Sequence, residues 1–217
     1  MSGVRWIGAQ RDVLAGDIRG HAALADLAAT RHLYGLGPLE GVSGEVSIFG
    51  GPPSIARIDA GTVVTTETWD ARACFLVWAQ VVSWSERPLA SGLAGLARVE
   101  DEVIARARER SLDLERPFPF RVRGVVAAAT LHVLDKRDGL PHNSERHEQA
   151  KVRQTLDRAA VELIGFHSGQ HRGVFTPRDS NVHVHLRTQD GRVSGHLEEI
   201  RFEPGARVAV PAAGWTQ

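Results

Sequence analysis

The sequence has little cysteine, no long apolar run and no excess of charge of either sign. Its one cysteine, Cys74, lies in the apolar segment ACFLVWAQVV, so we expect a buried thiol and no internal disulfide. No apolar run approaches the roughly 18 residues that a transmembrane helix needs. Lysine plus arginine balance aspartate plus glutamate at 26 each, giving a formal net charge of zero. This balance argues against a protein that coats nucleic acid or an anionic membrane.

Several familiar signatures are missing as well. The sequence has no Walker A loop and no G-x-S-x-G nucleophile elbow, which argues against a serine hydrolase. Gly35-x-Gly37 begins like a dinucleotide fingerprint, but Glu40 occupies the place of the third glycine, so we expect no nucleotide cofactor. No secretory signal is visible, and we expect a cytoplasmic protein without a nucleic-acid or membrane partner. A homodimer is compatible with the sequence.

The pattern of apolar residues predicts an α+β protein with a few helices, built mainly on antiparallel or mixed sheet. Helical spacing predicts one helix over residues 17–32 and a second, amphipathic helix over residues 91–110. Roughly ten short alternating segments predict strands before and after that second helix. Its end suggests an N-terminal α/β lobe of residues 1–116 and a C-terminal β-rich lobe of residues 117–217, which can also form one integrated domain.

Two segments of the C-terminal half have the composition of loops and turns. Residues 135–149 are polar and predict a surface loop or short helix in which His142 and His147 are exposed. Pro204-Gly205 separates two alternating segments and predicts the turn of a last hairpin.

The segment NVHVHLRTQDGRVSGHLEE, residues 181–199, carries the most informative pattern in the chain. His183 and His185 alternate with Val182 and Val184, which is the period of a strand with one apolar face and one histidine face. The segment therefore predicts a strand that presents two imidazoles on the same side of a sheet.

A turn signal then predicts what faces those two histidines. Asp190-Gly191 is a strong signal for a hairpin, and we expect a two-residue type I′ loop there. In that register His185 lies opposite His196, and His183 lies opposite Glu198. Opposed side chains on one sheet face have Cβ atoms about 4.5–5.5 Å apart. The hairpin therefore brings three histidines and one carboxylate together.

Three imidazoles at this spacing predict a site for a divalent metal, most readily zinc. Zinc binds histidine nitrogens at roughly 2.0–2.1 Å, and catalytic zinc sites use three protein ligands and an open position. The alternatives are ordinary surface or core histidines, since a register slip of one residue would turn His196 to the opposite face. A purely structural zinc site is less favoured, because such sites usually have four protein ligands and are often rich in cysteine.

The strand pattern around Glu45 indicates which way its side chain points. It alternates with Val46 and Ile48, so it lies on the face of its strand opposite these apolar side chains. This pattern taken alone favours a glutamate that points into solvent.

The segments above, taken in order, resemble the alpha-acetolactate decarboxylase family over most of the chain. The family's N-terminal signature, which ends in a Gly-Glu pair before a strand, is similar to LYGLGPLEGVSGEVSIFGG. An apolar strand and the stretch before an arginine-bearing strand are matched by ACFLVWAQVVSW and PFPFRVRG. The metal segment is matched by IGFHSG and VHVHLRTQDGRVSGHLEE, with the same H-x-H-x10-H spacing, which is the most specific feature. The plant and prokaryote conserved domain is a related fold with a similar histidine pattern, but it is shorter and lacks the Gly-Glu segment.

The resemblance implies a fold, a site and a reaction. Members of the family are two-lobed proteins that bind zinc and decarboxylate acetolactate to acetoin. Carried over by position, the resemblance implies His183, His185 and His196 as metal ligands. It also implies that Glu45 is an active-site carboxylate, which reverses the solvent-facing interpretation.

The chain also departs from the family pattern. The family's catalytic arginine falls eight residues after the glycine of PFPFRVRG, and here that position is His132. The family's glutamate from the C-terminal tail has no counterpart after Glu203. Glu198, on the expected metal face, is a candidate fourth ligand or proton-transfer group. The alternative is that strand twist places Glu198 at the rim, in water.

Together these observations predict a metal-dependent decarboxylase that acts on acetolactate or a similar small 2-hydroxy-3-oxo acid. The metal would act as a Lewis acid on the substrate's oxygens, and Glu45 or Glu198 would deliver a proton. His132 would replace the arginine only when it is protonated. The alternative is a non-enzymatic metal-binding or regulatory protein of the same fold, which the missing arginine and tail glutamate favour.

Overall fold

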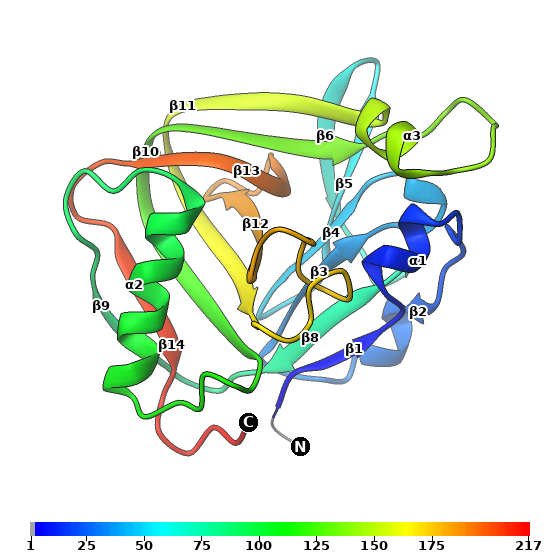
Figure 1. The fold of residues 1–217 in the computed structure, drawn as a ribbon. Coiled ribbons are helices and arrows are strands. Elements are labelled where there is room, and N and C mark those ends of the chain that lie inside the picture. The colour runs from blue at the N-terminus through cyan, green and yellow to red at the C-terminus, as the bar shows by residue number, and fades with distance from the viewer. Residues whose placement is uncertain (1–2) are drawn as a thin grey trace.

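The computed structural model, which describes residues 3–217, contains two six-stranded sheets that pack face to face, with short helices around them (Figure 1). Every named strand pairing is antiparallel. The predicted α+β class and the antiparallel sheet are therefore confirmed. No helix among residues 3–217 is both long enough and apolar enough to cross a membrane.

The first sheet is built from the N-terminal part of the chain. Its strands, in spatial order, are β1 (Arg5–Ile7), β8 (Leu76–Gln80), β3 (Leu33–Pro38), β4 (Glu45–Phe49), β5 (Ser54–Asp59) and β6 (Thr62–Glu67). A small two-stranded sheet of β2 (Ala22–Ala23) and β7 (Arg72–Ala73) lies beside it. Strand β4, near the middle of the order, contributes to the site described below.

The second sheet closes on itself. Its strands, in spatial order, are β11 (Lys151–His167), β12 (Val182–Thr188), β13 (Ser194–Phe202), β10 (Phe118–Leu134), β14 (Arg207–Pro211) and β9 (Trp84–Pro88). The two long strands β10 and β11 also pair with each other, so β10 to β13 form a closed ring of four strands. Because the ring is closed, these four strands have one face toward its interior and one face outward.

The helices are short apart from one. They are α1 (Gln10–Leu14), α2 (Leu96–Glu109), α3 (Ser144–Gln149) and the 3₁₀ helices η1 (Leu24–Leu27) and η2 (Glu40–Val42). The second predicted helix is confirmed over 96–109, where Val99, Val103 and Ala107 form the buried stripe that packs against β13 and β14.

The first predicted helix, over residues 17–32, is wrong. This segment forms strand β2 and the 3₁₀ helix η1 instead. The backbone of Gly20 bonds to distant side chains, since its N–H donates to Glu40 Oε1 over 3.0 Å and its carbonyl accepts from Arg72. These tertiary bonds replace the local bonds that a helix would need.

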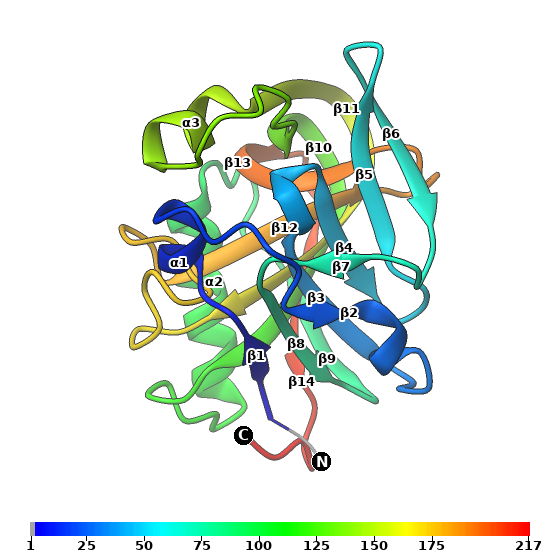
Figure 2. The same cartoon turned by 90° about the vertical axis from the view of Figure 1, so that its right-hand side faces the viewer.

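Both faces of the first sheet are covered, which decides where polar residues of β4 lie. Val46 and Ile48 pack with Leu24 under the η1 segment. Phe49, on the opposite face of β4, joins the core between the two sheets. Strand β4 lies against β12 and β13, as the side view in Figure 2 shows. Glu45 and Ser47 share the face of Phe49 and are therefore buried between the sheets.

The strand register of the histidine hairpin is confirmed, although its turn differs from the prediction. His185 pairs with His196 as expected. The loop is longer than two residues, because the Thr188 N–H donates to Val193 O over 2.9 Å and Asp190 does not adopt the positive φ that a type I′ turn requires. A two-residue and a four-residue loop share the same centre, so the pairs from Arg187–Ser194 to His185–His196 are those expected. The ladder ends there, and the expected pair of His183 with Glu198 is not formed.

The last hairpin and the boundary between lobes were also predicted from the sequence. The predicted last hairpin at Pro204-Gly205 is wrong as a pairing, because β14 pairs with β10 and β9 and not with β13. The lobe boundary after residue 116 stays a prediction. Along the chain, membership changes from the first sheet to the second earlier, between Gln80 and Trp84.

Candidate metal centre

Strand β12 places two histidines between the sheets. Its apolar residues Val182, Val184 and Leu186 point into the core inside the ring of strands. His183 and His185 alternate with them, so both rings point outward toward the first sheet, where they are buried. The alternation seen in the sequence thus becomes a division between an apolar interior and a histidine face.

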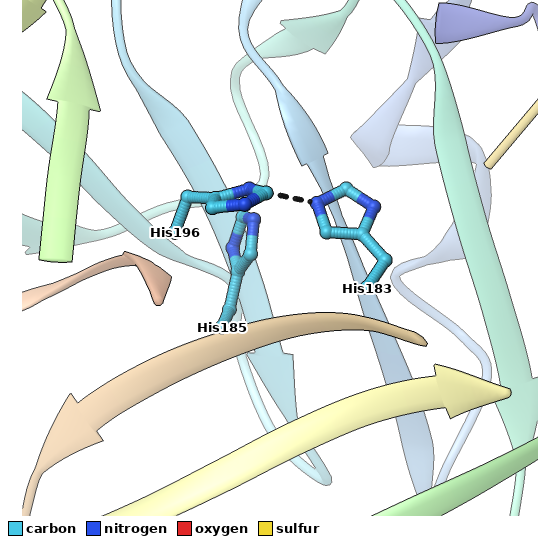
Figure 3. Close-up of side chains that lie close together, drawn as sticks. All are labelled: His183, His185 and His196. Carbon is cyan, nitrogen blue, oxygen red and sulfur yellow. Dashed lines mark hydrogen bonds between the residues drawn. The ribbon is translucent and has the colours of Figure 1, made fainter. Parts of the chain in front are cut away.

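Strand β13 adds the third histidine. Its pairing with β12 places His196 opposite His185, and the three rings converge (Figure 3). His183 Nε2 lies 3.0 Å from His196 Nδ1, and one nitrogen of each ring lies within 4.8 Å of the other two. Three nitrogens bound to one zinc ion at roughly 2.0–2.1 Å would stand about 3.3 Å apart. The cluster therefore has nearly the dimensions of a three-histidine metal site.

Hydrogen bonds hold two of the rings in the orientation that a metal ligand needs. His183 Nδ1 lies 2.8 Å from the Phe175 carbonyl, which can only accept, so Nδ1 carries the proton and Nε2 keeps its lone pair. His185 Nδ1 lies 2.9 Å from Ser47 Oγ on β4. His185 Nε2 is buried and has no hydrogen-bond partner. An orphaned ring nitrogen beside two others fits a metal ion.

Burial keeps these rings neutral, which is the form that binds a metal. Removal from water lowers the pKa of His183 to about 4 and lowers the pKa values of His185 and His196 well below the ordinary range. The positive charge that each ring would acquire on protonation also disfavours protonation of its neighbours. The donor set, its burial and its protonation state all fit a divalent cation such as zinc.

Glu45 lies beside this cluster, brought there by the first sheet. Its Oε2 atom is 3.7 Å from His185 Nε2, and its side chain is 2% exposed. The interpretation of Glu45 as a solvent-facing residue is therefore wrong, because the second sheet covers the polar face of β4. Burial raises the pKa of Glu45 well above its usual value, and the charge of Lys151 partly opposes this effect.

Glu198 lies in a β-bulge of β13. Leu131 pairs with Leu197 and Thr130 pairs with Glu199, so Glu198 is the extra residue of the bulged strand. Its carboxylate accepts a hydrogen bond from His132 Nδ1 over 2.9 Å and another from Arg153 Nε over 2.8 Å.

These contacts bear on the two roles expected for Glu198. The hydrogen bond from His132 and, to a smaller extent, the hydrogen bond from Arg153 lower the pKa of Glu198 to about 2. Its roles as a fourth ligand or proton-transfer group stay predictions. Its partners in the structure are His132 and Arg153, and the cluster suited to a metal consists of the three histidines alone among the described residues.

His132, at the position of the family's arginine, stacks on a metal-site ring. Its ring centroid is 4.5 Å from that of His196, with an angle of 22° between the planes. Burial lowers the pKa of His132, and the hydrogen bond to Glu198 opposes this change. The net direction favours the neutral ring, whereas the expected carboxylate-binding role requires the protonated one.

A cavity of about 780 Å³ opens onto the candidate site. His183, His196 and Glu45 line it, together with His132 and Glu198. Its wall also includes Lys151, His147 and several apolar side chains, among them Phe75, Val13 and Leu134. Five of the six site residues named from the sequence thus share one cavity, and the sixth, His185, lies beside His183 and His196.

Sequence reasoning missed several parts of this site. Ser47 could have been found, because it shares the strand face of Glu45. The carbonyl of Phe175 comes from the loop between β11 and β12, and no sequence pattern predicts its contact with His183. Lys151, the first residue of β11, was missed because no motif in the sequence singles it out.

The two histidines expected to be exposed are not. His142 is buried at 5% exposure and its Nε2 atom lies 3.2 Å from His147 Nδ1, so the exposed interpretation is wrong. The short helix α3 that follows His142 contributes Ser144, His147 and Glu148 to the lining of the cavity. Cys74, by contrast, is a buried core thiol as predicted.

Comparison with solved structures identifies the fold. The crystal structure of alpha-acetolactate decarboxylase from Bacillus subtilis strain 168 superposes with a TM-score of 0.77 and 15% identity, covering 97% of this chain and 85% of that one. The enzyme from Bacillus subtilis subspecies spizizenii gives a TM-score of 0.78 and 14% identity, covering 97% and 86%. The chain has the alpha-acetolactate decarboxylase fold. A Staphylococcus aureus protein of unknown function, described as similar to alpha-acetolactate decarboxylase, superposes with a TM-score of 0.76 and 14% identity. The match covers 95% of this chain and 84% of that one.

The acetolactate decarboxylase fold extends over nearly the whole chain, so the fold expected from the resemblance is confirmed. No family model matches the sequence, and no curated protein does either. At 14–15% identity the likeness establishes the fold alone.

Proposed function

We propose that the protein is a metal-dependent decarboxylase that acts on acetolactate or a similar small 2-hydroxy-3-oxo acid, as a divergent member of the acetolactate decarboxylase family. One observation carries the proposal. Three neutral histidines with convergent nitrogens and a buried carboxylic acid from the opposite sheet meet at one cavity. A site that only stores metal does not need the buried acid.

His183, His185 and His196 would hold the metal, for which zinc is the first candidate. When bound, the metal supplies Lewis-acid chemistry, polarising the oxygens of a bound substrate. Ser47 and the Phe175 carbonyl orient two of the ligand rings, which limits the positions where a substrate can be held. Phe75 and Leu134 exclude water from the adjoining wall of the cavity.

Glu45 is the proposed proton donor. In decarboxylation the bond between the carboxylate carbon and the hydroxyl-bearing carbon breaks, carbon dioxide leaves, and the electron pair moves toward the neighbouring carbonyl oxygen. A proton must then reach the carbon that lost the carboxylate. Glu45 lies 3.7 Å from His185 Nε2 and lines the cavity, so a substrate held by the three histidines would lie beside it.

The alternative is a non-enzymatic metal-binding protein of the same fold. The observation that favours it is the replacement of the family's arginine by His132, whose burial favours the neutral ring. In this alternative Glu45 would serve only to balance the charge of the metal.

The test measures metal content and turnover on the same preparation. Purified protein is analysed for bound metals, then assayed for carbon dioxide release from acetolactate before and after chelation and zinc addition. We expect roughly one metal ion per chain, because the histidines form a single cluster, and release that depends on it.

Two variants sharpen this test. Glu45→Gln should keep the metal and lose about 10²–10⁴-fold in turnover, the usual contribution of a general acid. Glu67→Gln, an exposed glutamate on β6 outside the cavity, is the matched control and should leave turnover unchanged. Metal without any carbon dioxide release from the wild-type protein would favour the binding-protein alternative.

A further inference from the structure

Lys151 opens strand β11 at the wall of the cavity that the histidines line. The chain has only two lysines, Lys136 and Lys151, whereas all its other basic residues except histidine are arginines. Lys136 pairs with Asp138 and does not line the cavity. Lys151 therefore places a compact, flexible cation where the surrounding structure otherwise uses arginine.

The candidate site needs a cation, because its proposed substrate carries a carboxylate. His132, at the position of the family's arginine, is buried and its Nδ1 atom is already paired with Glu198 Oε1 over 2.9 Å. Arg178 also lines the cavity but is exposed at the loop between β11 and β12. Lys151 is the partly buried cation of the lining, with 19% of its side chain exposed.

The partners of Lys151 leave its charge available. Its Nζ atom lies 2.6 Å from Glu148 Oε2 and 3.8 Å from Glu198 Oε1. Both carboxylates are also bound by Arg153, through Nε to Glu198 and through a short contact to Glu148. Glu148 is more than half exposed, and ion pairs of this kind contribute little. Lys151 can therefore exchange its contact with Glu148 for a bound anion at small cost.

Lys151 shares the wall of the cavity with the proposed acid and with two of the proposed ligands. Glu45, His183 and His196 line the same cavity. The ammonium group of Lys151 is therefore placed to meet an anion held beside them.

We propose that Lys151 binds the carboxylate of the acid held at the metal centre and so selects an acid over an uncharged hydroxyketone or diol. This inference rests on the proposed function for the nature of the ligand. Because the carboxylate loses its charge as carbon dioxide leaves, an ion pair with Lys151 stabilises the bound acid more than the transition state. Loss of Lys151 should therefore weaken binding and raise KM without lowering kcat.

The test uses the zinc-loaded full chain and two stable probes. The first is 2,3-dihydroxy-2-methylbutanoate, which keeps the carboxylate and has two neighbouring oxygens but cannot decarboxylate as a 3-oxo acid does. The second is butane-2,3-diol, which lacks the carboxylate. Calorimetry should show that Lys151→Met weakens binding of the acid about tenfold and leaves binding of the diol unchanged, since one charge-assisted hydrogen bond is lost.

Controls separate this effect from a loss of structure. Lys151→Arg keeps the charge and should recover most of the affinity for the acid, while Lys136→Met should behave as wild type. Lys151→Gln replaces Lys151→Met if the latter does not fold. In turnover, KM for acetolactate should rise about tenfold in Lys151→Met, with kcat changed less than about threefold.

The outcomes distinguish the two proposals. Equal affinity of Lys151→Met and wild type for the acid overturns the inference, even if the protein releases carbon dioxide from acetolactate. A wild-type protein that binds the diol as well as the acid also overturns it. Lysine-dependent binding of the acid without carbon dioxide release would support the inference and count against the proposed decarboxylase.

Discussion

At the scale of single residues, the hydrogen bond between Ser47 and His185 joins the two sheets at the candidate metal centre. Ser47 Oγ and His185 Nδ1 are both buried and lie 2.9 Å apart, although 138 positions separate them in the chain. The partner of the second nitrogen fixes the orientation and tautomer of a ligand histidine. Ser47 is therefore a positioning residue for His185.

We expect Ser47→Ala to weaken zinc binding about 10–100-fold without unfolding the protein, because the ring of His185 loses its orienting partner. Competition with a chromogenic chelator measures the affinity. Ser54→Ala is the matched control, since Ser54 is buried on the neighbouring strand and has no described hydrogen bond to a histidine. Unchanged zinc affinity in Ser47→Ala would show that the bond is incidental.

At the scale of elements, the β-bulge in β13 determines where Glu198 points. Without the extra residue, the ladder between β10 and β13 would continue in one register, and Glu198 would pair directly with a residue of β10. The bulge lets its carboxylate reach both His132 on β10 and Arg153 on β11. The element therefore couples Glu198 to the ring that stacks on His196.

The variant Glu198→Gln separates the two roles expected for this residue. A fourth ligand predicts a loss of zinc affinity, whereas a proton-transfer role predicts a turnover loss of about 10²-fold with zinc retained. The hydrogen bonds from His132 and Arg153 occupy both carboxylate oxygens and lower the pKa of Glu198, so they favour neither role. Glu199→Gln, at the exposed neighbouring position, serves as control. If Glu198→Gln changes neither zinc affinity nor turnover, Glu198 has neither role.

At the scale of the whole molecule, burial of histidines links folding to pH. His147 is partly buried beside His142, and removal from water lowers its pKa to about 3. In the unfolded chain the same ring takes up a proton near pH 6.5. Between these two values the unfolded state binds more protons, so the free energy of unfolding falls as the pH falls. The stabilising effect is complete above pH 6.5 and is lost progressively toward pH 3.

We therefore expect the metal-stripped protein to lose stability steadily from pH 7 to pH 4, as measured by urea unfolding at each pH. Replacing His147 by Gln should flatten this dependence by at most ~1.4 kcal/mol per pH unit, the limit for one proton. His21→Gln, a more exposed histidine paired with Asp17, is the control. An unchanged slope in His147→Gln would mean that His147 is as accessible to protons in the folded protein as in the unfolded chain.

How much the sequence reveals differs between these scales. The period of β12 and the signal at Asp190-Gly191 were enough to predict that His185 faces His196, because a hairpin is a local structure. The first helix was predicted wrongly, since Gly20 makes its bonds to side chains distant in sequence. The exposure of Glu45 was predicted wrongly from pattern alone, since a strand does not reveal what covers its second face.

The sequence by itself determined several local elements: two histidines on one face of β12, a third brought opposite by the hairpin, and the amphipathic helix at 96–109. Only the tertiary structure decided that β4 would cover that face, which buries Glu45 and supplies Ser47. The same holds for Lys151, which β11 places at the cavity wall. The physical reason is that alternation and turn chemistry act over a few residues, whereas burial and charge partners depend on contacts between distant segments.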